Sequence, residues 1–204
     1  MVWDVLVVLF VLLMILQLKR VLQLAPLLSD SLFRVRGSST LENSVHYSAD
    51  RNRLAYTFMI PAVLVTARYE LYRPSFLEPL PPNLYLLAVA GVLVAFMLLR
   101  QLMFWWLKPR HRYDSYVLAH QTGYTYFIVL MVLVLVTVGV LTVFHAKDWV
   151  FRGIIYVEIP LVYSFYLFRK TQILSLFCNP LRTFLYLCGL EFLPAALLMV
   201  SAAL

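Results

Sequence analysis

A chain of 204 residues is long enough for one or two soluble domains. Its composition excludes that class, because 63% of the residues are hydrophobic and only 13% are charged, whereas soluble domains are roughly half apolar and a quarter charged. The net charge of +7 comes from short basic clusters between apolar runs, a pattern that suits anionic lipid headgroups and argues against a nucleic-acid partner.

Six apolar runs stand out along the chain. Crossing the hydrocarbon core takes about 20 helical residues, and a helix satisfies its own backbone hydrogen bonds. The sequence therefore predicts an all-α, polytopic transmembrane helix bundle that forms a single domain over residues 1–204. If the second run is re-entrant, five spans remain instead of six. The runs extend from Met1 to Leu18, Leu54 to Ala67, Leu84 to Leu107, Tyr116 to Phe144, Trp149 to Phe168 and Leu181 to Leu204.

The first run has the charge pattern of a retained membrane helix. Asp4 is the only charged residue before or within it, and Lys19 and Arg20 follow it. A secretory signal has the opposite polarity and a small-residue cleavage site. We therefore expect this helix to stay in the protein, with its amino end outside the cytoplasm.

The loop over residues 19–53 is the longest, and we expect it to be cytoplasmic. Its first half, VLQLAPLLSDSLFRVR, mixes apolar and basic residues as a helix on the membrane surface does. Its second half, GSSTLENSVHYSADRN, is polar and is expected to be irregular. The next loop contains the proline-rich residues 73–82, which cannot form a continuous helix.

Basic residues are distributed unevenly between the two sets of loops, which predicts the orientation of the chain. The first, third and fifth loops hold twelve Lys and Arg residues, among them Arg169 and Lys170, and the second and fourth loops hold four. Cytoplasmic loops carry the excess of Lys and Arg. Both termini are therefore expected outside the cytoplasm.

Two glutamates within apolar runs are the strongest candidate site residues, because polar groups in a bilayer are costly and often functional. Glu158 lies two residues before Pro160, and Glu191 lies three residues before Pro194. Proline removes a backbone donor and crowds the carbonyl four residues earlier, so both helices are expected to kink. Each glutamate either fixes helix packing or forms a proton or ligand site, and we favour packing.

Glu191 has only apolar neighbours on its own helix, which predicts that it points into the bundle and meets a donor from another helix. Arg100 either snorkels to the headgroups or turns inward to a carboxylate of the fifth or sixth run, and we predict the inward contact. His120 opens the polar stretch 120–126, where an interfacial hydrogen bond is favoured over a proton relay. The candidate donors to Glu191 are Arg100, His120, Tyr126 and Tyr163.

Motifs for catalysis, cofactor binding and metal binding are missing from the sequence. There is no Walker A loop, G-x-S-x-G elbow, H-E-x-x-H or C-x-x-C pattern, and the four histidines are scattered. Cys178 and Cys188 are ten residues apart, or about 15 Å on one helix, so they cannot form a disulfide with each other. We therefore predict no catalytic residue, no cofactor and no metal.

Short motifs in the carboxy-terminal third resemble a known family. They are Arg169-Lys170-x-Gln172-Ile173-Leu174-Ser175 and Phe184-Leu185-Tyr186-Leu187-Cys188-x-Leu190-Glu191-x-Leu193-Pro194, with Arg100-Gln101 and Tyr126-Phe127 further upstream. Together they resemble a family of uncharacterised multi-pass inner-membrane proteins of Bacteroidota, a domain of unknown function. The resemblance implies a bacterial inner-membrane location and lends no activity.

Three functions remain open on the sequence alone. The one we favour is a non-enzymatic scaffold or assembly component that joins other envelope proteins in a membrane complex. The first alternative is a small transporter or channel that uses Glu158 and Glu191, and the second is a membrane enzyme acting on a lipid or isoprenoid. A continuous polar cavity reaching both glutamates would favour transport, a lateral opening lined by histidine and carboxylates would favour the enzyme, and a solid bundle with an exposed small-residue face would favour the scaffold.

Overall fold

The computed structural model describes residues 2–33, 45–77, 80–106, 113–176 and 179–203. Within these ranges the chain is helical, with turns between the helices and no strand. The elements are α1 (Val2–Phe33), α3 (Val45–Thr57), α4 (Met59–Arg68), a 3-10 turn (Ser75–Leu77), α5 (Pro82–Trp106), α6 (Tyr113–Val143), α7 (Asp148–Ser175), α8 (Pro180–Leu187), a π-helix (Cys188–Phe192) and α9 (Leu193–Ala203).

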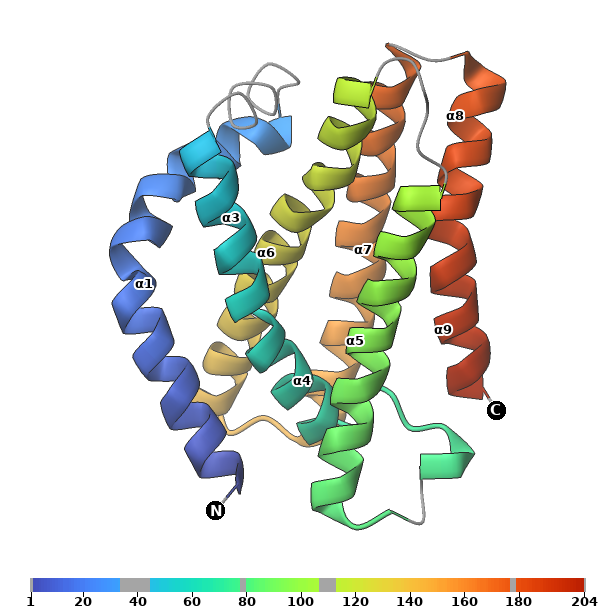
Figure 1. The fold of residues 1–204 in the computed structure, drawn as a ribbon. Helices are drawn as coiled ribbons and strands as arrows, with labels where there is room; N and C mark the ends of the chain where they lie inside the picture. Colours follow the sequence, from blue (N-terminus) through green and yellow to red (C-terminus); the bar gives the residue numbers. More distant parts are fainter. Residues whose placement is uncertain (1, 34–44, 78–79, 107–112, 177–178, 204) are drawn as a thin grey trace.

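Four helices in the described residues are long and apolar enough to cross a membrane. They occupy Leu84–Trp106, Tyr116–Val143, Asp148–Ser175 and Thr183–Ala202. These segments coincide with the third to sixth apolar runs, so the prediction of an all-helical membrane protein is confirmed. Figure 1 shows that successive passes run in opposite directions and that both chain ends lie at the same end of the bundle.

Helix α1 is longer than the first apolar run. It continues past Leu18 through Lys19 and Arg20 to Phe33, and Pro26 lies inside it. Figure 1 shows α1 bending in its second half, as expected where a proline removes a backbone donor. Residues 21–33 of the predicted loop are therefore helical and continue the first helix without a break, whereas residues 34–36 lie outside the described residues.

The prediction that residues 37–52 are irregular is wrong from Val45 onward, where α3 begins; residues 34–44 lie outside the described residues. The polar sequence is helical because its inner face is buried between α1 and α6. Tertiary packing of this kind outweighs a weak local preference for loop. The apolar contact joins Leu24, Leu28, Leu54, Ala55, Phe58, Ala62, Ile128 and Met131.

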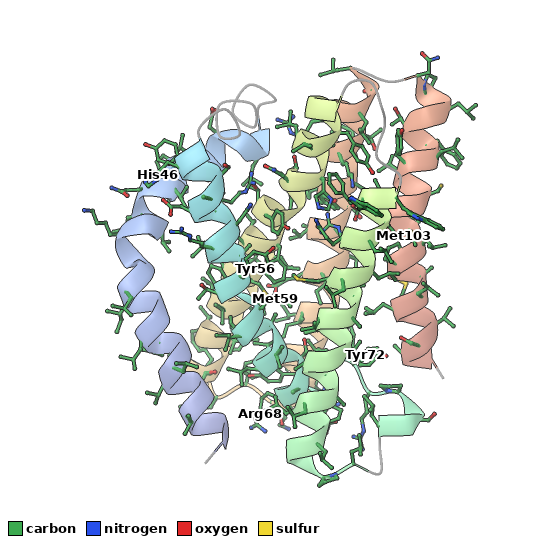
Figure 2. The ribbon with its side chains drawn as sticks, in the orientation of Figure 1. His46, Tyr56, Met59, Arg68, Tyr72 and Met103 are labelled. Atoms are coloured by element: carbon green, nitrogen blue, oxygen red, sulfur yellow. The ribbon has the colours of Figure 1, made fainter. Side chains whose placement is uncertain are left out.

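The second apolar run is divided between α3 and α4, and the break falls at Phe58. Pro61 explains the break, because proline has no N–H to donate to the carbonyl of Thr57, four residues earlier. The backbone N–H of Phe58 still donates to Leu54 and that of Ala62 to Phe58, so α4 follows directly on α3. Figure 2 labels Tyr56 and Met59, which lie midway along the bundle where α3 passes into α4.

Two helices end in a left-handed residue. Glu70 after α4 and His145 after α6 have φ of 49° and 50°. In each case the next residue donates its N–H five residues back, from Leu71 to Thr66 and from Ala146 to Leu141. Helices that end in this way usually have glycine as the left-handed residue.

The prediction that the proline-rich residues 73–82 cannot form a continuous helix is confirmed where the structure describes them. They contain the 3-10 turn and the first residue of α5 and no longer helix.

Helices α6 and α7 share the most extensive contact in the described structure. At one end of their interface Ile155 of α7 is fully buried, and Phe151 of α7 stacks on Tyr69, the residue after α4, with ring centroids 4.8 Å apart. Towards the other end Tyr126 of α6 packs against Tyr166 of α7, with centroids 5.7 Å apart. Tyr166 belongs to the polar centre of the bundle, where α5 and the last pass meet this pair.

Candidate functional site

Glu191 lies on the π-helix Cys188–Phe192, which interrupts the last pass. Pro194 cannot donate to the carbonyl of Leu190, and the wider turn accommodates this, because the N–H of Leu193 reaches back five residues to Cys188. The predicted distortion before Pro194 is therefore present as a π turn. The turn lies next to α5 and α7, and the Glu191 side chain is only 5% exposed.

Three donors from two other helices surround one oxygen of Glu191. Tyr166 donates to Oε1 at 2.5 Å, Arg100 Nη2 lies 3.2 Å from the same atom, and Lys170 Nζ forms an ion pair with it. Tyr163 also donates to the backbone carbonyl of Glu191, at 3.2 Å. The prediction that Glu191 points inward and bonds across helices is confirmed.

Arg100 faces the interior of the bundle and contacts Glu191, so the inward prediction is confirmed and the snorkelling alternative is wrong. Its Nη2 is also 2.6 Å from the hydroxyl of Tyr166. The guanidinium reaches this position past Gly123 on α6, where an added Cβ would lie 2.3 Å from Nη2. A residue larger than glycine at position 123 would therefore force the guanidinium of Arg100 to shift.

The prediction that Arg169 and Lys170 lie in a basic loop after Phe168 is wrong. Helix α7 continues to Ser175, and Lys170 is only 1% exposed. Tyr166 and Lys170 are four residues apart and so share one face of α7, which brings both to Glu191. Arg169 is buried as well, and its Nη1 donates to Gln172 at 3.0 Å.

Glu158 belongs to a different place in the bundle. It is half-buried on α7, where Thr137 of α6 donates to its Oε1. Tyr166 is eight residues further along the helix, or about 12 Å, so the two glutamates share no partner. Helix α7 continues through Pro160 without a break, whereas a π turn precedes Pro194 in the last pass. The structure does not bring the two glutamates together.

His120 is buried beside Arg100 but does not contact Glu191. Its Nε2 lies 3.3 Å from Oε1 of Gln101, and its ring stacks on Phe104 with centroids 3.9 Å apart. Its Nδ1 is buried without a hydrogen-bond partner among the described residues. Of the four expected donors, Arg100 reaches the Glu191 side chain and Tyr163 its backbone, whereas His120 and Tyr126 reach neither.

The charged cluster, defined as Arg100, Lys170 and Glu191, holds two cations and one anion. All three residues lie within helices that are long and apolar enough to span a membrane. Desolvating such groups costs several kcal/mol each, roughly, and only close pairing and hydrogen bonding offset the cost. Removing one partner from this arrangement leaves an uncompensated buried charge. The cluster therefore links α5, α7 and the last pass strongly to one another.

A cavity of about 270 Å³ reaches the cluster from the side of α3 and α4. Arg100, Gln101 and His120 form its polar end, and most of its remaining lining is apolar or aromatic. A second cavity, of about 440 Å³, lies along α6 and α7 and has Arg169 and Gln172 in its wall. Among the described residues, no three histidine, cysteine, aspartate or glutamate side chains lie close enough together to bind a metal ion.

Comparison of the chain with protein-family models, curated proteins and solved structures gives no match. The resemblance noted in the sequence thus stays an expectation, and the function has to be inferred from the geometry.

Proposed function

We propose that this protein is a non-enzymatic scaffold or assembly component of an envelope complex, built as a six-pass protein of the bacterial inner membrane. In this proposal α1 and the α3–α4 pair add two passes to the four apolar helices. The alternating directions of the helices and the common position of the two ends support an even number of passes. Even without Arg169 and Lys170, which lie within α7, the predicted first, third and fifth loops hold ten basic residues against four on the second and fourth, which supports termini outside the cytoplasm.

The observation that carries the proposal is that the Glu191 carboxylate bonds to side chains of two other helices. Its Oε1 accepts from Tyr166 and pairs with Arg100 and Lys170, which is the arrangement of a fixed link between helices. A transport site would instead need carboxylates that exchange partners along a polar route. Glu158 lies on a separate contact, and neither glutamate lines the cavity at Arg100. These features favour a structural role for the intramembrane charges over a transport role.

One exposed face of α5 suits a partner helix. Gly91 and Ala95 are exposed and four residues apart, and nothing lies within 4 Å of a Cβ added at Gly91. Small residues at this spacing allow two membrane helices to approach closely. The exposed side chains of Leu87 and Leu98 flank them on the same face. We propose this face as the place where the scaffold meets another membrane helix.

The test uses a photoreactive residue in native membranes. Placed at Leu87, it is expected to give one discrete cross-linked product, which mass spectrometry identifies as a second copy or another envelope protein. The change Gly91→Leu should remove the product, whereas Gly139→Leu should keep it, because Gly139 is equally open but lies on α6. Identical products in both variants, or none from the native chain, would contradict the proposed face.

A further inference from the structure

The charged cluster carries one more positive charge than negative charge. Arg100 and Lys170 both contact Glu191, and no second carboxylate among the described residues contacts either cation. Glu158, another carboxylate within the spans, bonds to Thr137 instead. An unbalanced charge in a low-dielectric interior is costly, so an anion that reaches the cluster is favoured there.

Arg100 is the accessible cation of the two. Its side chain is 23% exposed, whereas the side chain of Lys170 is 1% exposed. Arg100 lines the cavity of about 270 Å³ between α3, α4, α5 and α6, which gives a ligand a way to the guanidinium. Its Nη2 already bonds to Tyr166 and Glu191, so an oxyanion such as a carboxylate would bind through the remaining N–H donors of the guanidinium.

The rest of the cavity is suited to a hydrocarbon chain. Leu93, Phe96 and Met97 of α5 face Met59 of α4 and Phe127 of α6 across it. Binding pockets with mainly apolar walls and a few placed polar groups select amphiphilic ligands. The cavity is smaller than the range of roughly 300–1,000 Å³ in which drug-sized ligands bind, which favours one chain over the two chains and glycerol of a phospholipid.

We propose that this cavity binds a single-chain lipid carboxylate, with its carboxylate on Arg100 and its chain against the apolar wall. One negative charge balances the charged cluster, and the chain fills a space that water would occupy unfavourably. Such a ligand adds to the scaffold role proposed above and does not depend on it. It would tie α3 and α4 to α5 and α6 through a molecule drawn from the membrane.

The experiment uses the full-length protein in phosphatidylcholine nanodiscs and palmitate labelled with ¹³C at its carboxyl carbon. We expect a carboxyl resonance that protein-free nanodiscs lack, together with a higher midpoint of thermal unfolding. Hexadecanol, which has the chain without the charge, and inorganic phosphate, which has a charge without the chain, should each raise the midpoint far less. Equal effects of palmitate and either control would overturn the proposal.

Variants locate the ligand. Arg100→Met should weaken palmitate binding at least tenfold, and Arg169→Gln should leave it unchanged, since Arg169 lines the other cavity. In case Arg100→Met folds poorly, Met97→Trp fills the cavity while keeping all three charges of the cluster, and it should also abolish the new resonance. Val94→Trp is the matched control, because Val94 is exposed on the same helix outside the cavity. Binding that survives Met97→Trp, or that is lost only in Arg169→Gln, would place the ligand elsewhere and refute the assignment.

Discussion

Replacing Gly123 by alanine should destabilise the protein, although the same change usually stabilises a helix. Gly→Ala in the middle of a helix contributes about 0.5–1 kcal/mol of stability. At Gly123 the new Cβ would lie 2.3 Å from Arg100 Nη2 and 3.0 Å from its Cζ. Carbon and nitrogen atoms pack comfortably at roughly 3.5 Å, so the guanidinium has to move by about 1 Å.

That displacement disrupts two hydrogen bonds. Nη2 now lies 2.6 Å from the hydroxyl of Tyr166 and 3.2 Å from Glu191 Oε1, and hydrogen bonds to charged groups are worth about 1.5–3 kcal/mol each. Since the arginine can relax in part, we expect a net loss of about 1–3 kcal/mol, the usual cost of overpacking. The free energy of unfolding would be measured in mixed micelles with rising concentrations of dodecyl sulfate.

A double-mutant cycle makes this prediction specific. In an Arg100→Met background the clash is gone, so Gly123→Ala should become neutral or stabilising by up to about 1 kcal/mol, and the coupling energy should be about 1–4 kcal/mol. Gly139→Ala is the control, because nothing lies within 4 Å of its added Cβ, and it should stabilise both backgrounds. A gain of stability from Gly123→Ala in the native protein would refute the geometry of Arg100.

Three further predictions concern other parts of the chain. His145→Gly should raise the free energy of unfolding by about 1 kcal/mol, because glycine adopts the left-handed conformation at φ 50° without strain; His145→Ala, which keeps the strain, should not. Thr137→Val should lower the free energy of unfolding by about 1 kcal/mol, because the hydrogen bond to Glu158 is lost. An unchanged free energy of unfolding would show that this bond contributes nothing to stability. Single cysteines at Ser39 and Glu78 report orientation in intact spheroplasts treated with an impermeant maleimide. We expect labelling at Glu78, outside the cytoplasm, and none at Ser39, inside it; labelling at Ser39 but not at Glu78 would contradict the predicted topology.

The helical class and the inward contact of Glu191 were predictable because both follow from the cost of exposing polar groups to lipid. Hydropathy identified the four long apolar helices. Glu191, with apolar neighbours on every side, had to find its donors on other helices, and Arg100 was among the few candidates. Arguments of this kind need no knowledge of which helices are neighbours.

The remaining site depended on helix ends and on neighbours that a sequence pattern does not fix. Lys170 was counted as a loop cation because apolar residues thin out after Phe168, yet α7 continues to Ser175. The spacing of Tyr166 and Lys170, four apart on one helical face, was the available signal. The sequence does not predict that Gly123 makes room for the guanidinium of Arg100. That contact depends on where the side chain of Arg100 crosses α6.

The central claim is that Glu191 is ionised and pairs with the two cations that bind the last pass to α5 and α7. Comparing the free energies of unfolding of Glu191→Gln and Lys170→Met tests it directly. If the claim is right, Glu191→Gln leaves two buried cations unpaired and costs about 3–5 kcal/mol, whereas Lys170→Met leaves the balanced pair of Arg100 and Glu191 and costs less than about 1.5 kcal/mol. If Glu191→Gln instead stays within about 0.5 kcal/mol of the native protein, the carboxyl is neutral and the claim is wrong.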